Sequence, residues 1–128
     1  MHPHRVLVPL ALAAFISLSG CASLTASAPV QVREGLLVGQ NQMTLYTFDK
    51  DAANSGKSVC NGPCAANWPP LLADDDARAT GDYTVIVRDD GRKQWAFKGK
   101  PLYHWVKDQK PGDVTGDGFN QVWRAARP

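Results

Sequence analysis

Thiols and imidazoles are scarce in this chain of 128 residues, which holds three cysteines and three histidines. His2, His4 and Cys21 belong to an N-terminal segment that has the features of an export signal. Removal of the signal would take away His2 and His4, and a lipid would block the Cys21 thiol, so the remaining groups are Cys60, Cys64 and His104. One imidazole and two thiols are too few for a zinc signature, and we find no nucleophile-elbow, phosphate-loop or nucleotide-binding motif. The sequence therefore favours a non-catalytic protein without a cofactor.

The N-terminal segment predicts a lipid anchor. A weakly basic start precedes an apolar run from Val6 to Leu18, which is too short for a transmembrane helix. The run ends in Leu18-Ser19-Gly20-Cys21, which looks like the cleavage site of a bacterial lipoprotein signal peptide. We therefore predict a signal peptide over residues 1–20, diacylglycerol on Cys21, and a flexible tether over residues 21–29. Such a protein lies at a membrane face on the periplasmic side, and Ala22 favours the outer over the inner membrane.

The close spacing of Cys60 and Cys64 has two interpretations. In an oxidising compartment two thiols this near predict a disulfide, and Asn61-Gly62-Pro63 supplies the tight turn that brings them together. Alternatively, they form a thiol-redox pair or bind Cu(I), with His104 and Met43 as extra ligands. A packing role for His104 is the competing interpretation of that residue.

The rest of the chain predicts a small antiparallel all-β domain with minor helix over residues 30–128. Several short apolar runs separated by Gly, Pro and Asp have strand character; they are Val30–Arg33, Leu36–Val38, Met43–Phe48, Tyr83–Arg88, Gln94–Lys98, Leu102–Val106 and Gln121–Arg124. Asp90-Gly91 predicts a hairpin between two of these runs. The one expected helical turn lies at Pro63–Asn67.

Two segments are similar, which predicts two related halves over residues 36–72 and 83–124. LYTFDKD begins at Leu45 and LYHWVKD begins at Leu102, an offset of 57 residues (102 minus 45). The matching motif residues are Tyr46, Phe48 and Asp51 in the first half and Tyr103, Trp105 and Asp108 in the second. They form either an exposed surface that binds a ligand through aromatic rings and carboxylates, or a packed core with the aspartates capping turns.

These motifs resemble the bacterial secreted-repeat lipoproteins described by a Yx(FWY)xxD motif. The resemblance also rests on Cys60-Asn-Gly-Pro-Cys64, Trp68-Pro69-Pro70, Gly99-Lys-Pro101 and Pro111-Gly112-Asp113, and covers nearly all of residues 39–123. It implies a duplicated, exported and membrane-anchored domain, but it implies no activity.

Other features add little chemistry. A net charge of +2 gives no basic face or run, so we expect no nucleic-acid partner. Asp113 to Gly118 resembles the start of a calcium-binding loop, but Arg124 stands where such a loop needs an acidic ligand. The leading hypothesis is an envelope module that binds a small ligand or an envelope protein. The alternative is a redox or copper-handling accessory protein that uses Cys60 and Cys64.

Overall fold

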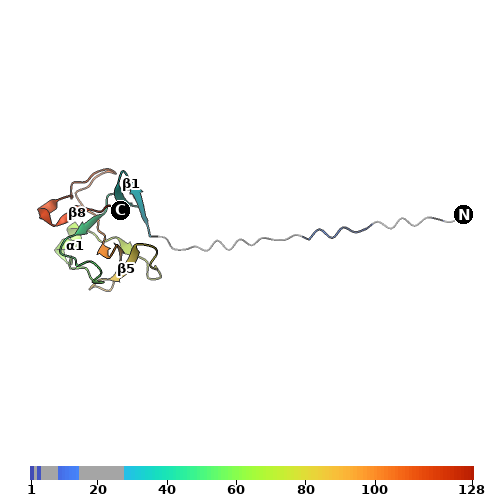
Figure 1. Ribbon diagram of the computed structural model, residues 1–128, viewed down its shortest axis with the longest axis horizontal. Helices are drawn as coiled ribbons and strands as arrows, with labels where there is room; N and C mark the ends of the chain where they lie inside the picture. Colours follow the sequence, from blue (N-terminus) through green and yellow to red (C-terminus); the bar gives the residue numbers. More distant parts are fainter. Residues whose placement is uncertain (2, 4–8, 15–27) are drawn as a thin grey trace.

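The computed structural model describes residues 1, 3, 9–14 and 28–128, and the folded domain occupies residues 28–128 (Figure 1). Most of the predicted signal peptide, the lipidation site Cys21 and most of the tether lie outside the described residues. Within the described residues, no helix is long and apolar enough to cross a membrane.

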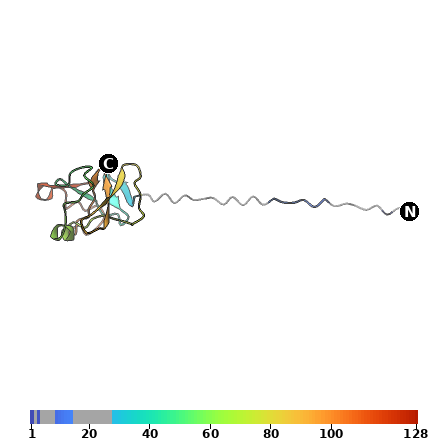
Figure 2. The same ribbon diagram turned by 90° about the horizontal axis from the view of Figure 1, so that it is seen from below.

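The domain begins with the antiparallel hairpin of β1 (Val30–Arg33) and β2 (Leu36–Gly39). Glu34 and Gly35 connect the two strands with φ angles of 51° and 78°. Two successive positive φ angles give a turn whose twist matches that of the strands, which explains the glycine. The C-terminus lies beside this hairpin, where Leu37 N donates to Ala126 O at 2.9 Å (Figure 1, Figure 2).

A second pair joins the two ends of the domain. Strand β3 (Tyr46–Phe48) pairs antiparallel with β8 (Trp123–Ala125), so residues near the start and the end of the fold are neighbours. Tyr46 lies opposite Ala125, and Phe48 lies opposite Trp123.

The largest sheet has β6 (Lys93–Phe97) at its centre, between β5 (Tyr83–Val87) and β4 (Leu72–Ala73), with β7 (Lys100–Pro101) also paired to β6. The predicted Asp-Gly hairpin joins β5 to β6, and Gly91 has the expected positive φ of 83°. The predicted helical turn is α1 (Pro63–Asn67), and a 3-10 turn, η1, covers Phe119–Gln121. The antiparallel β fold predicted from the sequence is therefore confirmed.

One predicted strand is wrong. Leu102–Val106 is not a continuous strand, because the segment is held at Tyr103 by single bridges to Tyr46 and Pro70. The predicted strand at Gln121–Arg124 is shifted, since β8 begins only at Trp123, after η1. Short bridges replace long ladders because several segments meet around Tyr46 and Tyr103, so no single pair of strands can extend there.

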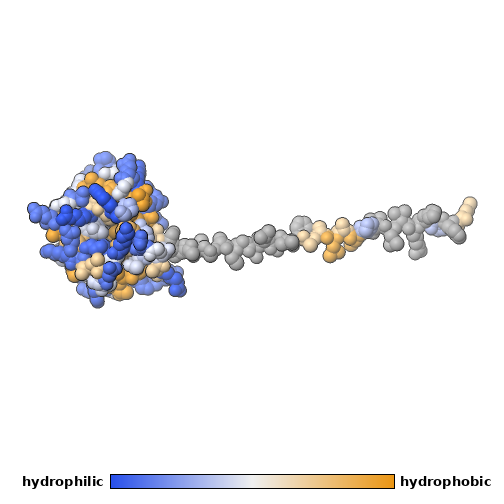
Figure 3. Space-filling model, in the orientation of Figure 1, coloured by the Kyte–Doolittle hydropathy of each residue, from blue (hydrophilic) through white to orange (hydrophobic). Residues whose placement is uncertain are grey.

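The core has two hydrophobic clusters. The first is built from aromatic side chains of both motifs with Trp68, Trp123 and Cys60. The second is built mainly from leucines around Trp95. On the face shown in Figure 3, hydrophobic residues form small separate areas within a largely hydrophilic surface.

Candidate functional site

The two motif tyrosines lie at the centre of the domain, where the halves meet. Tyr46 and Tyr103 exchange backbone hydrogen bonds, with N–O distances of 2.8 and 2.9 Å, and both side chains are fully buried. Each hydroxyl donates to the aspartate of the opposite motif: Tyr46 to Asp108 at 2.6 Å and Tyr103 to Asp51 at 2.5 Å. The two halves are therefore joined by a reciprocal exchange of tyrosine–carboxylate bonds.

The second oxygen of each aspartate holds the loop that follows its own motif. Asp51 accepts from Val59 N at 2.7 Å, and Asp108 accepts from Thr115 N at 3.0 Å. Burial raises the pKa of Asp51, while the hydrogen bonds from Tyr103 and Val59 oppose that rise. Burial also raises the pKa of both tyrosines, so their hydroxyls stay protonated and donate. The predicted turn-capping role of the aspartates is confirmed.

A stack of aromatic rings crosses the interface between the halves. Trp68 stacks on Trp123 with a centroid distance of 3.8 Å, and the outer rings are Trp105 on Trp68 at 3.9 Å and Phe48 on Trp123 at 4.2 Å. The stack alternates between halves, because Phe48 and Trp68 come from the first and Trp105 and Trp123 from the second. Burial of four large rings in one contact is the main apolar contribution to this cluster.

The C-terminal segment of each half is hydrogen-bonded to the other half. Leu71, three residues after Trp68, donates to Leu102 O at 2.9 Å and accepts from Trp95 N at 2.9 Å. Ala126, three residues after Trp123, donates to Leu45 O at 2.8 Å and accepts from Leu37 N at 2.9 Å. The equivalent bonds relate the halves by an approximate two-fold operation, so each half completes the other.

The interpretation of the motif residues as an exposed binding surface is corrected by their burial. The side chains of Tyr46, Phe48, Tyr103 and Trp105 are at most 8% exposed, and those of the motif aspartates are equally inaccessible. Their polar atoms are engaged within the core. The alternative, a packed core, is what the structure contains.

The cysteine pair forms a disulfide, with an S–S distance of 2.07 Å, as its spacing predicted. Cys60 is fully buried in the aromatic cluster, and Cys64 packs against that cluster. Because the two sulfurs are bonded to each other, neither is a free thiolate that could bind copper. The disulfide instead closes the loop that leads into α1 and Trp68.

A buried arginine from the second half fastens this loop. The Arg88 side chain is 3% exposed and donates to Cys60 O at 2.7 Å, Ser58 Oγ at 2.9 Å and Gln94 Oε1 at 2.8 Å. Ser58 Oγ lies 2.7 Å from the hydroxyl of Tyr103, so the network continues to the Tyr103–Asp51 bond. Arg88 was not among the residues predicted from the sequence, where it was only the end of a strand.

A hollow of about 570 Å³ lies beside the disulfide loop. Its lining comes from both halves: Asn61, Gly62, Ala65 and Ala66 from the first, and Arg88, Asp89, Asp90 and Arg92 from the second. Arg92 forms an ion pair with Asp90 at 2.7 Å, and Asn61 donates to Asp89 at 3.2 Å. The hollow is thus open, polar and lined by charges of both signs.

His104 lies in a separate, smaller cavity of about 140 Å³, which is lined by Asn41, Met43, Thr44, His104, Trp105 and Asp108. The chain leaves the bridge directly after Tyr103, and the adjacent residues His104 and Trp105 both line this cavity. Burial lowers the pKa of His104, so its imidazole is neutral at neutral pH. The structure brings Met43 and His104 together, but not with the cysteine pair.

The calcium-like loop has its carboxylates turned to other partners. Asp113 accepts from the backbone N of Gln109 at 2.9 Å and of Lys110 at 3.1 Å, while Asp117 accepts from Ala125 N at 2.9 Å. Over residues 28–128, no group of three or more His, Cys, Asp or Glu side chains is arranged to hold a metal ion.

The comparisons with known proteins agree with the duplication. The model of a family described as a secreted repeat of unknown function matches the chain twice, over residues 30–72 and 84–127. No curated protein and no solved structure matches it. The two matches correspond to the two halves that exchange tyrosine–aspartate bonds.

Proposed function

Because this chain belongs to the family of secreted repeats, we propose that it is a lipid-anchored module on the periplasmic side of the cell envelope that binds a ligand non-catalytically. The Leu18-Ser19-Gly20-Cys21 sequence supports the lipid anchor, and the small polar residues 22–29 suit a tether. The disulfide between Cys60 and Cys64 fits a protein that functions in an oxidising compartment.

The hollow beside the disulfide loop is the observation that carries the binding function. Its volume, about 570 Å³, is in the range of small-molecule sites, and it lies where the two halves meet, a common position for binding pockets. The disulfide and the Arg88 network hold its walls in place, which lowers the entropic cost of binding. Its mixed charges suit a small polar ligand or a polar loop of an envelope protein.

The burial of the two motif aspartates and of Ser58 supports a non-catalytic role. Asp51 and Asp108 are buried with their oxygens accepting hydrogen bonds, and Ser58 is 2% exposed. A general acid, a general base or a nucleophile must reach the substrate. These groups face the core instead, where they join the two halves.

The lipid anchor is tested with a Cys21→Ala variant. We expect the native protein to partition into the detergent phase of a cell extract and its N-terminal peptide to carry the mass of a diacylglycerol thioether. Cys21→Ala should lose both properties. Membrane fractionation then tests whether the protein lies in the outer membrane, the location that Ala22 favours. Native protein that is unmodified at Cys21 would contradict the anchor.

Binding is tested by photo-crosslinking in living cells. Ala66 lines the hollow and is exposed, so a photoreactive residue there faces anything bound. The matched control is the same residue at Val32, which is 60% exposed on β1 and lies outside the hollow. For a protein partner we expect an adduct from position 66 and not from 32. For a small ligand we expect changes in the amide chemical shifts of residues 61–66 when a periplasmic extract of small molecules is added. The absence of both the adduct and the amide shifts would contradict binding at this surface. Equal adducts from positions 66 and 32 would also contradict it.

A further inference from the structure

The loop after each motif begins with the same turn. Asp51 N donates to Phe48 O at 3.0 Å in the first half, and Asp108 N donates to Trp105 O at 3.1 Å in the second. The offset of 57 residues pairs these positions and also pairs Met43 with Lys100 (100 minus 43). The two turns therefore have equivalent backbone oxygens, but the side chain paired with each turn differs: Lys100 for the first and Met43 for the second.

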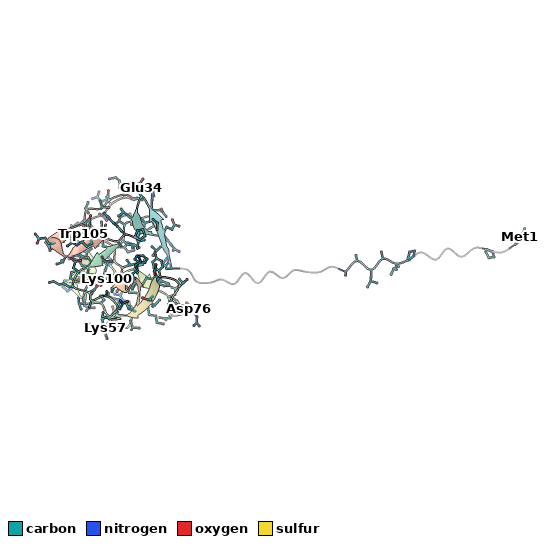
Figure 4. All side chains as sticks on the ribbon, viewed as in Figure 1. Met1, Glu34, Lys57, Asp76, Lys100 and Trp105 are labelled. Carbon is teal, nitrogen blue, oxygen red and sulfur yellow. A yellow bond between two sulfur atoms is a disulfide. The ribbon has the colours of Figure 1, made fainter. Side chains whose placement is uncertain are left out.

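In the first half, the turn is occupied by a cation from the protein itself. The ammonium of Lys100 donates to Phe48 O at 2.8 Å and to Asp51 O at 2.6 Å. Lys100 is half-buried, and its label lies over the middle of the folded domain in the view of Figure 4. Backbone oxygens at a tight turn are good acceptors for a positive charge, and here the lysine supplies it.

In the second half, the equivalent place is a cavity. Met43 stands where the two-fold relation would place a lysine, and the cavity of about 140 Å³ lies between Met43, His104, Trp105 and Asp108. Neither ring nitrogen of His104 is hydrogen-bonded to any of the described residues, and burial alone accounts for its lowered pKa. The imidazole lies against Gly39, where an added Cβ would come within 3.3 Å of His104 Cε1.

We propose that this cavity is a binding site for a soft monovalent cation, Cu(I), with the Met43 thioether and the His104 imidazole as its ligands. The site lies beside the turn after the second motif, as the Lys100 ammonium lies at the turn after the first. A thioether and a neutral imidazole select Cu(I) over hard cations such as Mg²⁺ and Ca²⁺, which need several oxygen ligands. The site shares no lining residue with the hollow beside the disulfide loop, so it is independent of the binding surface proposed above.

The donor atoms explain why the sequence did not isolate this site. Met43 and His104 are 61 positions apart (104 minus 43), so the sequence offers them only as additions to a cysteine site. The disulfide removes the two thiolates, and the fold then brings the thioether and the imidazole together without them.

The site is tested by titrating the full-length exported protein, disulfide intact and any free thiols alkylated, with Ag(I), an air-stable probe for Cu(I). We expect saturation at one equivalent, with quenching of tryptophan fluorescence because Trp105 lines the cavity. Competition with a chromophoric Cu(I) chelator then gives the copper affinity. Met43→Leu and His104→Gln should each weaken silver and copper binding by roughly 10-fold or more. Thr47→Gln, at the equivalent position in the first half, is the matched control and should bind normally.

A Met43→Lys variant tests the two-fold argument directly. The new ammonium should occupy the cavity as Lys100 occupies its counterpart, so Ag(I) binding should be lost while the protein remains folded. Binding that is unchanged in Met43→Leu and His104→Gln would overturn the proposal, as would the absence of any saturable silver binding in the native protein. A Met43→Lys variant that binds silver as the native protein does would also overturn it.

Discussion

The loop after the first motif, residues 52–62, and the loop after the second, residues 109–118, are held by different residues around the same tyrosine–aspartate exchange. The first is fastened by the Lys100 ammonium, the Arg88 guanidinium and the disulfide. The second is fastened by Thr115, whose N and Oγ1 both donate to Asp108, at 3.0 and 2.6 Å. The first loop is therefore closed by cationic side chains from the other half, whereas the second has an exposed ion pair between its own Lys110 and Asp113 and leaves a cavity beside its turn.

This difference separates what the shared fold needs from what varies between the halves. The exchange and the ring stack occur on both sides, so they belong to the fold. The Lys100 and Arg88 contacts and the disulfide occur at the first loop, and the cavity lined by Met43 and His104 occurs at the second. We expect function to reside in these unequal features, because a duplicated core leaves its two surfaces free to differ.

The largest expected effect is that of separating the halves. Residues 28–79 and 80–128, expressed as two chains, should each fail to fold, since β3 pairs with β8 and β4 pairs with β6 across the boundary. When mixed, they should recover the native far-UV circular dichroism and amide spectrum. A cooperative unfolding transition from either fragment alone would show that the halves are independent.

Much of this dependence could not be predicted from the sequence. The strand-rich composition, the duplication, the hairpin at Gly91, the helical turn and the disulfide all followed from local patterns. The exchange did not, because no local signal says that the Tyr103 hydroxyl bonds to the aspartate of the other motif. The Trp68–Trp123 stack and the role of Arg88 were missed for the same reason, since both depend on contacts between distant segments.

Gly116 is a core position that the sequence does not distinguish from the other glycines of its loop. A Cβ at Gly116 would lie 2.7 Å from the Trp68 ring and 2.9 Å from the Tyr46 ring. Only glycine therefore lets the second loop approach closely enough for its N–H to donate to the Tyr46 hydroxyl at 3.3 Å. In the sequence this residue is one of several glycines in a loop, and nothing there marks it as a core position.

The next prediction compares the two tyrosine hydroxyls. Tyr103→Phe should lower the free energy of unfolding by about 3 kcal/mol. The Asp51 carboxylate then keeps the Val59 N–H but loses the tyrosine hydroxyl, and Ser58 Oγ loses its contact with that hydroxyl. Tyr46→Phe should cost about 1.5 kcal/mol, because Asp108 still accepts two hydrogen bonds from Thr115. Urea unfolding of both variants measures the difference. Equal losses would mean that the Gly116 N–H, which loses its acceptor in Tyr46→Phe, costs as much as the lost contact between Ser58 and Tyr103.

The disulfide should have a smaller effect. Replacing both Cys60 and Cys64 with serine should lower the free energy of unfolding by about 2 kcal/mol, as expected for so short a closed loop. The second half has no disulfide at the equivalent place, so its loop serves as the internal reference: hydrogen exchange should speed up in residues 58–67 and remain unchanged in residues 109–118. Faster exchange in both loops would show that the disulfide acts on the whole domain.

The smallest expected effect concerns pH and has opposite signs in the two halves. Burial raises the pKa of folded Asp51 above 3.8, so the native state binds more protons just above that pH and this carboxyl lowers stability as the pH rises. Burial lowers the pKa of folded His104 below 6.5, so the unfolded state binds more protons just below that pH. Stability due to His104 is therefore lost as the pH falls below 6.5.

His104→Thr, which copies Thr47 of the first half, should remove this loss while leaving the effect of Asp51. The measurement is the difference in unfolding free energy between native protein and variant from pH 7.5 down to the acid range. A difference that does not change with pH would mean that the folded domain solvates the protonated imidazole of His104. The second half would then accommodate a positive charge beside its turn, as the first half accommodates the Lys100 ammonium.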